Sequence, residues 1–225
     1  MPIFRPDWRF VEIEHELWAL SQFLPWVEQQ IAYLRAQDRI RTEAELVEQG
    51  YKWEDGDTQV AFQQIYDRAE RIFPRFMRGP FILSLWACFE SSVMEVGDYL
   101  AREQHRELRL REVRGKDFVD GAVRYYSTVL GVPLDRDTLR LDRIRDLLRV
   151  RNAFAHGNGQ QRAVPPDKWA ALEQAIQRNP EIVVTDGVLV LSAHFLRTAW
   201  ADVDESVREL VLRVRGGPAV VVEGA

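Results

Sequence analysis

Apolar residues recur at intervals of three and four through most of this 225-residue chain, which is the spacing of one face of an α-helix. One stretch departs from this pattern. Residues 181–192 hold two runs rich in β-branched side chains around Asp186-Gly187, a pair that favours tight hairpin turns. The sequence therefore predicts an all-α fold, a helical bundle with one small β-hairpin near residues 181–192.

Breaks in the periodicity suggest where the first helices end. Pro25 is expected to kink or split a helix over residues 8–37. The capping-box pattern Thr42-Glu43-Ala44-Glu45 then predicts the start of a short helix that Gly50 ends. The next helix should run over residues 58–78.

Proline and glycine also divide the rest of the chain. We expect a bend near Pro74 and a break at Gly79-Pro80, before the most apolar helix of the chain at residues 80–104. Further helices are predicted at residues 117–129, 137–155 and 193–214, and a short one is opened by Pro165-Pro166-Asp167 and closed by Asn179-Pro180.

The composition bounds the class of protein. Apolar residues make up 46% and charged residues 29% of the chain, as in folded globular proteins. With Cys88 as its only cysteine, the chain has no internal disulfide, and its first seven residues lack the apolar core of a signal peptide. We expect a cytoplasmic protein. The longest apolar run, residues 81–89, is far below the roughly 20 residues of a membrane span and predicts a core helix.

Charge and motif content narrow the function. The net charge of −5 argues against loose binding to nucleic acid, although residues 101–151 alone carry 13 Arg and Lys against 9 Asp and Glu. The chain lacks a glycine-rich phosphate loop, a His-Glu-x-x-His motif and a cysteine pair, and its four histidines are scattered. We therefore expect neither a metal nor another cofactor, and Cys88 is interpreted as a packing residue.

One short segment stands out as a candidate site. Arg151-Asn-Ala-Phe-Ala-His156 closes the predicted helix 137–155, and Gly157-Asn158-Gly159 follows. Asn152 and His156, four residues apart, share a helix face, whereas Arg151 is rotated by about 140° from His156. Arg and His before a glycine are also typical of an ordinary helix C-terminus, where cations interact favourably with the helix dipole.

This segment resembles the HEPN superfamily (higher eukaryotes and prokaryotes nucleotide-binding domain), whose nuclease members carry Arg, a polar residue, and His four to six positions after the Arg. Arg151, Asn152 and His156 match that pattern, and Asn158 stands where one subgroup has Tyr. The resemblance implies one HEPN-like domain over residues 1–225, with an N-terminal helical accessory region at 1–55 and a HEPN core at 80–214. It also implies a homodimer in which two motif-bearing helix ends form one cleft.

The resemblance further implies a metal-independent endoribonuclease. His156 would take the proton of an RNA 2′-hydroxyl, its copy in the partner subunit would protonate the leaving 5′-oxygen, and Arg151 would hold the phosphate. A 2′,3′-cyclic phosphate would result. A toxin or phage-defence role, with an antitoxin as a regulatory partner, would fit such a protein. Two alternatives are a catalytically silent HEPN domain that binds RNA, a nucleotide or a protein, and an unrelated helical interaction module.

Glu90 is the fourth candidate site residue. It falls inside the apolar arc of the helix predicted at residues 80–104, and a carboxylate that faces a core needs a cationic or hydrogen-bonding partner. We expect Glu90 to orient Arg151. Pairing with another arginine, or a position at the edge of the core, is the alternative.

Overall fold

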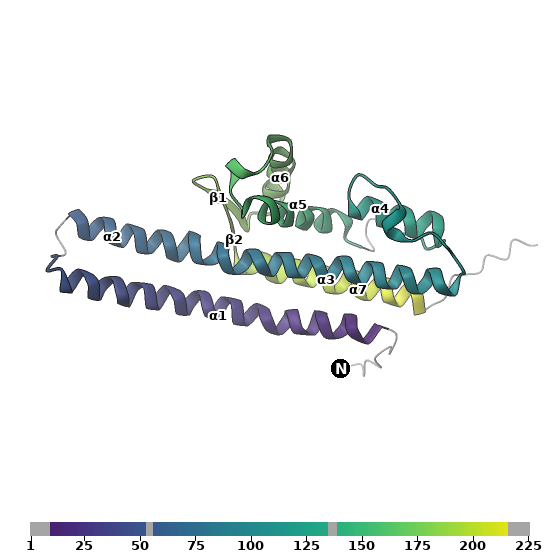
Figure 1. Ribbon diagram of the computed structural model, residues 1–225, viewed down its shortest axis with the longest axis horizontal. Coiled ribbons are helices and arrows are strands. Elements are labelled where there is room, and N and C mark those ends of the chain that lie inside the picture. The colour runs from purple at the N-terminus through teal and green to yellow at the C-terminus, as the bar shows by residue number, and fades with distance from the viewer. Residues whose placement is uncertain (1–9, 53–55, 135–138, 216–225) are drawn as a thin grey trace, which may run out of the picture. The chain divides into compact units, whose positions relative to one another are not determined.

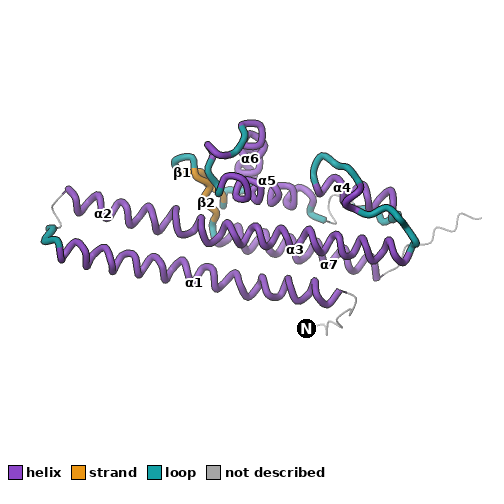
Figure 2. Tube along the Cα trace, viewed as in Figure 1, coloured by secondary structure: helices purple, strands orange, loops and turns teal. Residues whose placement is uncertain are grey.

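The computed structural model describes residues 10–52, 56–134 and 139–215. The described chain is mostly helical with one two-stranded antiparallel sheet, which confirms the predicted fold class; Figure 2 shows the two strands among the helices. The main elements, labelled in Figure 1, are α1 (Val11–Glu48), α2 (Gly56–Asp67), α3 (Phe73–Glu103), α4 (Phe118–Arg124), α5 (Leu141–Gly157), α6 (Pro166–Arg178), β1 (Ile182–Thr185), β2 (Val188–Leu191) and α7 (Ala193–Arg215).

The chain divides into two compact units, and neither is a continuous segment. The first unit comprises residues 1–20, 85–148 and 198–225, and the second unit comprises residues 21–84 and 149–197. The HEPN core at 80–214 and the accessory region at 1–55 stay predictions.

The core of the first unit is aromatic and aliphatic. Trp86 of α3 packs against Phe89 one turn away, and both rings meet Phe118 of α4 edge-on, with centroids 5.9 and 6.4 Å apart. Tyr126, fully buried, donates to the carbonyl oxygen of Val93 at 2.6 Å. The apolar run at residues 81–89 thus contributes core residues, as predicted.

The second unit contains an antiparallel pair of helices. Residues 21–48 of α1 lie beside α2 and the start of α3 (Figure 1). Their ion pairs have a regular register, Glu28 with Arg78 and Asp38 with Arg68. Between these two pairs, Arg35 reaches the carbonyl oxygen of Ala69. Charged side chains therefore fix how far one helix is shifted along the other.

Two of the expected breaks near the start of the chain are wrong. α1 continues past Pro25, which is exposed, so the helix is not split there, and the expected kink stays a prediction. It also continues through Thr42, whose hydroxyl donates to the carbonyl oxygen of Asp38 at 2.9 Å instead of capping a new helix. Gly50 does follow the helix end, with a φ of +75°, as predicted.

The break expected at Gly79-Pro80 is wrong, because α3 continues through both residues. The chain is also helical at Pro74, and the bend expected there stays a prediction. A five-residue π-helical segment, Arg68–Ile72, joins α2 to α3. In that register residue 74 would donate to the carbonyl of Ala69, and Pro74 has no N–H. The Nε of Arg35 donates to this carbonyl at 2.8 Å and so replaces the missing bond.

The predicted hairpin is confirmed. β1 and β2 pair antiparallel from Ile182 opposite Leu191 to Thr185 opposite Val188. Asp186 and Gly187 have φ values of +50° and +70°, the signs that a two-residue type I′ turn requires. Among the helices of the described residues, none has the length and apolar content that crossing a membrane requires.

Candidate active site

Helix α5 carries the Arg151 to His156 segment on its last turns. It begins at Leu141, and the expected start of this helix at residue 137 lies outside the described residues. The helix ends at Gly157, as the sequence predicted. Asn158 and Gly159 then take φ values of +46° and +71°, and the N–H of Gly159 donates to the carbonyl oxygen of Ala153 at 3.0 Å. The chain therefore turns sharply after the segment.

The ring of Phe154 fixes the segment in the second unit. A methyl group on Gly79 of α3 would lie 2.6 Å from this ring, and one on Gly159 would lie 3.1 Å from it. Phe154 is 5% exposed. The backbone of α3 at Gly79 thus approaches the ring as closely as glycine alone allows, and the turn after α5 packs tightly against it at Gly159. These contacts hold the end of α5 in place.

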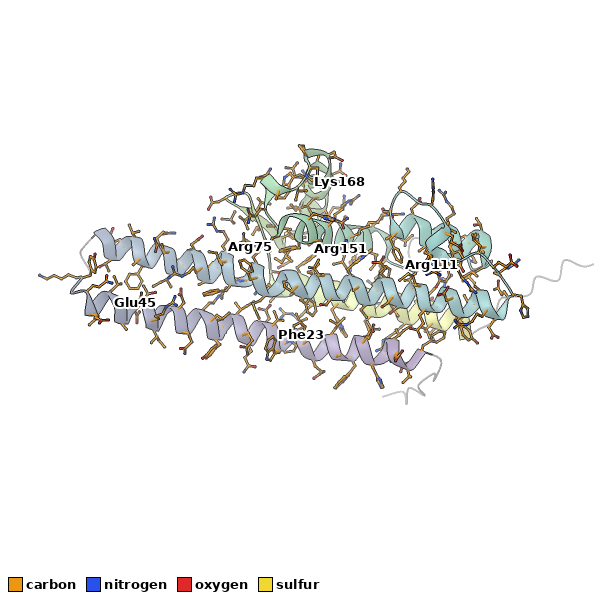
Figure 3. The ribbon with its side chains drawn as sticks, in the orientation of Figure 1. Phe23, Glu45, Arg75, Arg111, Arg151 and Lys168 are labelled. Atoms are coloured by element: carbon orange, nitrogen blue, oxygen red, sulfur yellow. The ribbon has the colours of Figure 1, made fainter. Side chains whose placement is uncertain are left out.

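His156 and Asn152 lie on the open side of this helix end. His156 is exposed and Asn152 is half-buried, while the neighbouring Ala153 and Phe154 face the core. Figure 3 labels Arg151 on α5. Its Nη1 donates to the side-chain oxygen of Asn152 at 2.9 Å. This bond joins the guanidinium to Asn152, which shares a helix face with His156.

Arg151 has hydrogen-bonding capacity left. Its Nε is buried and has no hydrogen-bond partner among the described residues. Within the described part of its own unit, no carboxylate forms an ion pair with it. A half-buried guanidinium in this state can bind an oxyanion with the donors that remain.

Glu90 belongs to the first unit, whereas Arg151 belongs to the second. The carboxylate of Glu90 is half-buried, and it accepts a hydrogen bond from Trp86 Nε1 at 2.9 Å. An indole N–H one turn away therefore supplies the hydrogen-bond partner that this position needs. The pairing of Glu90 with Arg151 stays a prediction.

A pocket near the end of α5 contains residues that sequence reasoning missed. It measures about 580 Å³ and lies in the second unit, between the start of α3, the loop after α5 and the hairpin turn. Its charged residues come from segments far apart in the chain, so no sequence motif or residue spacing could have predicted the pocket. Its lining residues are Arg71, Arg75, Gln160, Gln161, Arg162, Asp186, Gly187 and Val188; Arg75 is labelled in Figure 3.

In the described ranges, no three His, Cys, Asp or Glu side chains come together in a group that could hold a metal ion. Cys88 is buried. Compared with protein-family models, with curated proteins and with solved structures, the chain matches none of them.

Proposed function

We propose that the protein is a metal-independent endoribonuclease whose active site is formed by the α5 ends of two copies. The observation that carries this proposal is the Arg151–Asn152 hydrogen bond beside the exposed His156. Arg151 is a cation that forms no ion pair with a carboxylate in the described part of its unit. The side chain of His156 is an imidazole, a group that can accept and release a proton in catalysis. We infer the type of reaction from the resemblance to HEPN ribonucleases.

The proposed chemistry is an internal transesterification of RNA. A neutral His156 removes the proton of the 2′-hydroxyl, and the 2′-oxygen forms a bond to the adjacent phosphorus. The bond from phosphorus to the 5′-oxygen breaks, and that oxygen takes a proton from a protonated histidine. Arg151 donates to the phosphoryl oxygens, on which negative charge develops. The products are a 2′,3′-cyclic phosphate and a 5′-hydroxyl.

A second copy of the chain supplies the second histidine. One proton is removed and another is delivered on opposite sides of the phosphorus, which requires two groups if both transfers accompany one displacement. A two-fold axis beside the exposed end of α5 would bring two copies of His156 and of Arg151 to one cleft. The proposal therefore includes a homodimer.

The biological role that we propose follows from the same resemblance. A cytoplasmic toxin or phage-defence effector, restrained by an antitoxin protein, would use this chemistry. A catalytically silent domain that binds RNA, a nucleotide or a protein partner is the alternative, and it predicts no cleavage.

The experiment that tests the proposal compares the wild type with His156→Ala in an RNA cleavage assay containing excess EDTA. We expect the wild type to cleave and the variant to lose at least about a hundredfold in rate, since general acid–base catalysis contributes on the order of 10²–10⁴. Because His156 is exposed, its loss should change the free energy of unfolding by no more than about 1 kcal/mol. Cleavage that survives His156→Ala, or that EDTA stops, would refute the mechanism.

A further inference from the structure

The pocket beside the hairpin turn contains three arginines, and they differ in how far neighbouring carboxylates neutralise their charges. Arg71 lies between two carboxylates, 2.7 Å from Asp67 and 2.5 Å from Asp186. The Nε of Arg162 donates to the side-chain oxygen of Gln160 at 3.0 Å, which leaves its charge uncompensated. Among the described residues no carboxylate forms an ion pair with Arg75 or Arg162. The side of the pocket formed by these two residues is therefore cationic.

Arg75 has the more unusual surroundings of the two. Its guanidinium carbon lies 5.0 Å from the ring centre of Phe76, and its Nε is buried without a hydrogen-bond partner in the described chain. Burial and the neighbouring charge of Arg71 lower the pKa of Arg75, and the charge of Asp67 opposes this shift without reversing it. A buried donor without an acceptor is unfavourable, and a bound anion would accept from it.

The rest of the pocket wall offers neutral donors. Gln160 and Gln161 line it with amide side chains. The N–H of Gln161 donates to the carbonyl oxygen of Gly187 at 2.8 Å, and the N–H of Leu189 donates to that of Gly159 at 2.8 Å. These two bonds join the loop after α5 to the hairpin, so the amides and Arg162 have a fixed framework behind them.

We propose that this pocket binds a phosphate group through Arg75 and Arg162. Guanidinium groups and primary amides are the donors that suit phosphate oxygens, and about 580 Å³ is enough for a nucleotide unit. Gln160, which lines the pocket, is four residues after His156 in the chain. We assign this phosphate to an RNA strand, at a nucleotide other than the one that is cleaved. The assignment to RNA rests on the proposed function. A free nucleotide or inorganic phosphate presents the same chemistry.

A substitution at Asp186 should change the affinity for phosphate in the opposite direction. Its carboxylate is 78% exposed at the pocket wall, where it repels an anion and neutralises Arg71. Asn tolerates the left-handed backbone of this turn position, so Asp186→Asn removes the charge with little strain. The variant should bind phosphate more tightly than the wild type, whereas loss of a merely structural ion pair would not produce that gain.

The test measures binding of a short 2′-O-methyl oligoribonucleotide, which has no 2′-hydroxyl and cannot be cleaved by the proposed reaction. We expect Arg75→Gln and Arg162→Gln each to weaken binding about tenfold, the cost of one charge-assisted contact. Each should also lower the slope of log affinity against log salt by about one. Arg197→Gln, an exposed arginine of α7 outside the pocket, is the matched control.

Parallel titrations with ATP and with inorganic phosphate identify the source of the phosphate. Binding of these two but not of the oligonucleotide, with the same dependence on Arg162, would keep the phosphate site and overturn RNA as its source. Unchanged affinity for all three probes in Arg162→Gln and Asp186→Asn, both at exposed positions, would overturn the site itself. Weaker binding by Arg162→Gln and tighter binding by Asp186→Asn, together with cleavage that survives His156→Ala, would support the pocket and refute the proposed nuclease.

Discussion

Gly79 of α3 lies so close to Phe154 that a methyl group at residue 79 would be 2.6 Å from the phenyl ring. Carbon atoms that are not bonded to each other do not approach so closely, so this contact depends on the missing side chain. Phe154 sits between Asn152 and His156 in sequence. The glycine therefore sets the position of the candidate active site from another helix.

Gly79→Ala should destabilise the protein by about 1–3 kcal/mol, the usual cost of overpacking a core. Chemical denaturation measures this change. Gly56→Ala is the control, because a methyl group at residue 56 would have no other atom within 4 Å. In a double-mutant cycle, Phe154→Leu should recover part of the loss in Gly79→Ala. Equal stability of Gly79→Ala and Gly56→Ala would contradict the close packing.

The elements with strong local signals were predictable from the sequence. Asp186-Gly187 specifies its own turn because both residues tolerate positive φ, and the hairpin has the expected bounds within one residue. The end of α5 at Gly157 was equally predictable from the sequence. In each case the residues that determine the conformation are neighbours in the chain.

The missed features depend on residues distant in sequence. At Pro74 the carbonyl of Ala69 lacks its helical donor, and Arg35 of α1 donates to it instead, a contact that no local pattern predicts. Gly79 meets a ring that comes 75 positions later. The same limit applies to the arginine pocket, because its walls come from three separate segments. Local patterns carry no information about such encounters.

Glu90 offers a prediction that separates a structural role from a positioning role. Glu90→Gln keeps an oxygen that can accept from Trp86 Nε1, so stability should change little. Glu90→Leu leaves that indole N–H, on a side chain that is 2% exposed, without an acceptor and should cost about 1–3 kcal/mol. If the carboxylate orients Arg151, both variants lose RNA cleavage. Full activity in a well-folded Glu90→Gln would remove Glu90 from the site.

Cys88 should be unreactive in the folded protein. Burial, together with the charge of Glu16, raises the pKa of its thiol to about 12. At pH 8 the reactive thiolate is then only about 10⁻⁴ of the total, whereas an unfolded chain with an ordinary thiol has far more. Mass spectrometry after treatment with iodoacetamide should find no alkylation in native buffer and complete alkylation in urea. Rapid labelling of the native protein would contradict the buried thiol.

The homodimer is testable at the exposed end of α5. Ala155 is exposed between the buried Phe154 and the exposed His156, so Ala155→Arg adds a bulky cation where two copies of the helix end are proposed to meet. The fold itself should tolerate it, because a cation near a helix C-terminus interacts favourably with the dipole. Light scattering should show a dimer for the wild type and a monomer for Ala155→Arg, with RNA cleavage lost in the monomer. Ala170→Arg, at an exposed alanine of α6, should stay dimeric and active. A wild-type monomer at micromolar concentration that cleaves RNA at full rate would show that one chain holds the whole site.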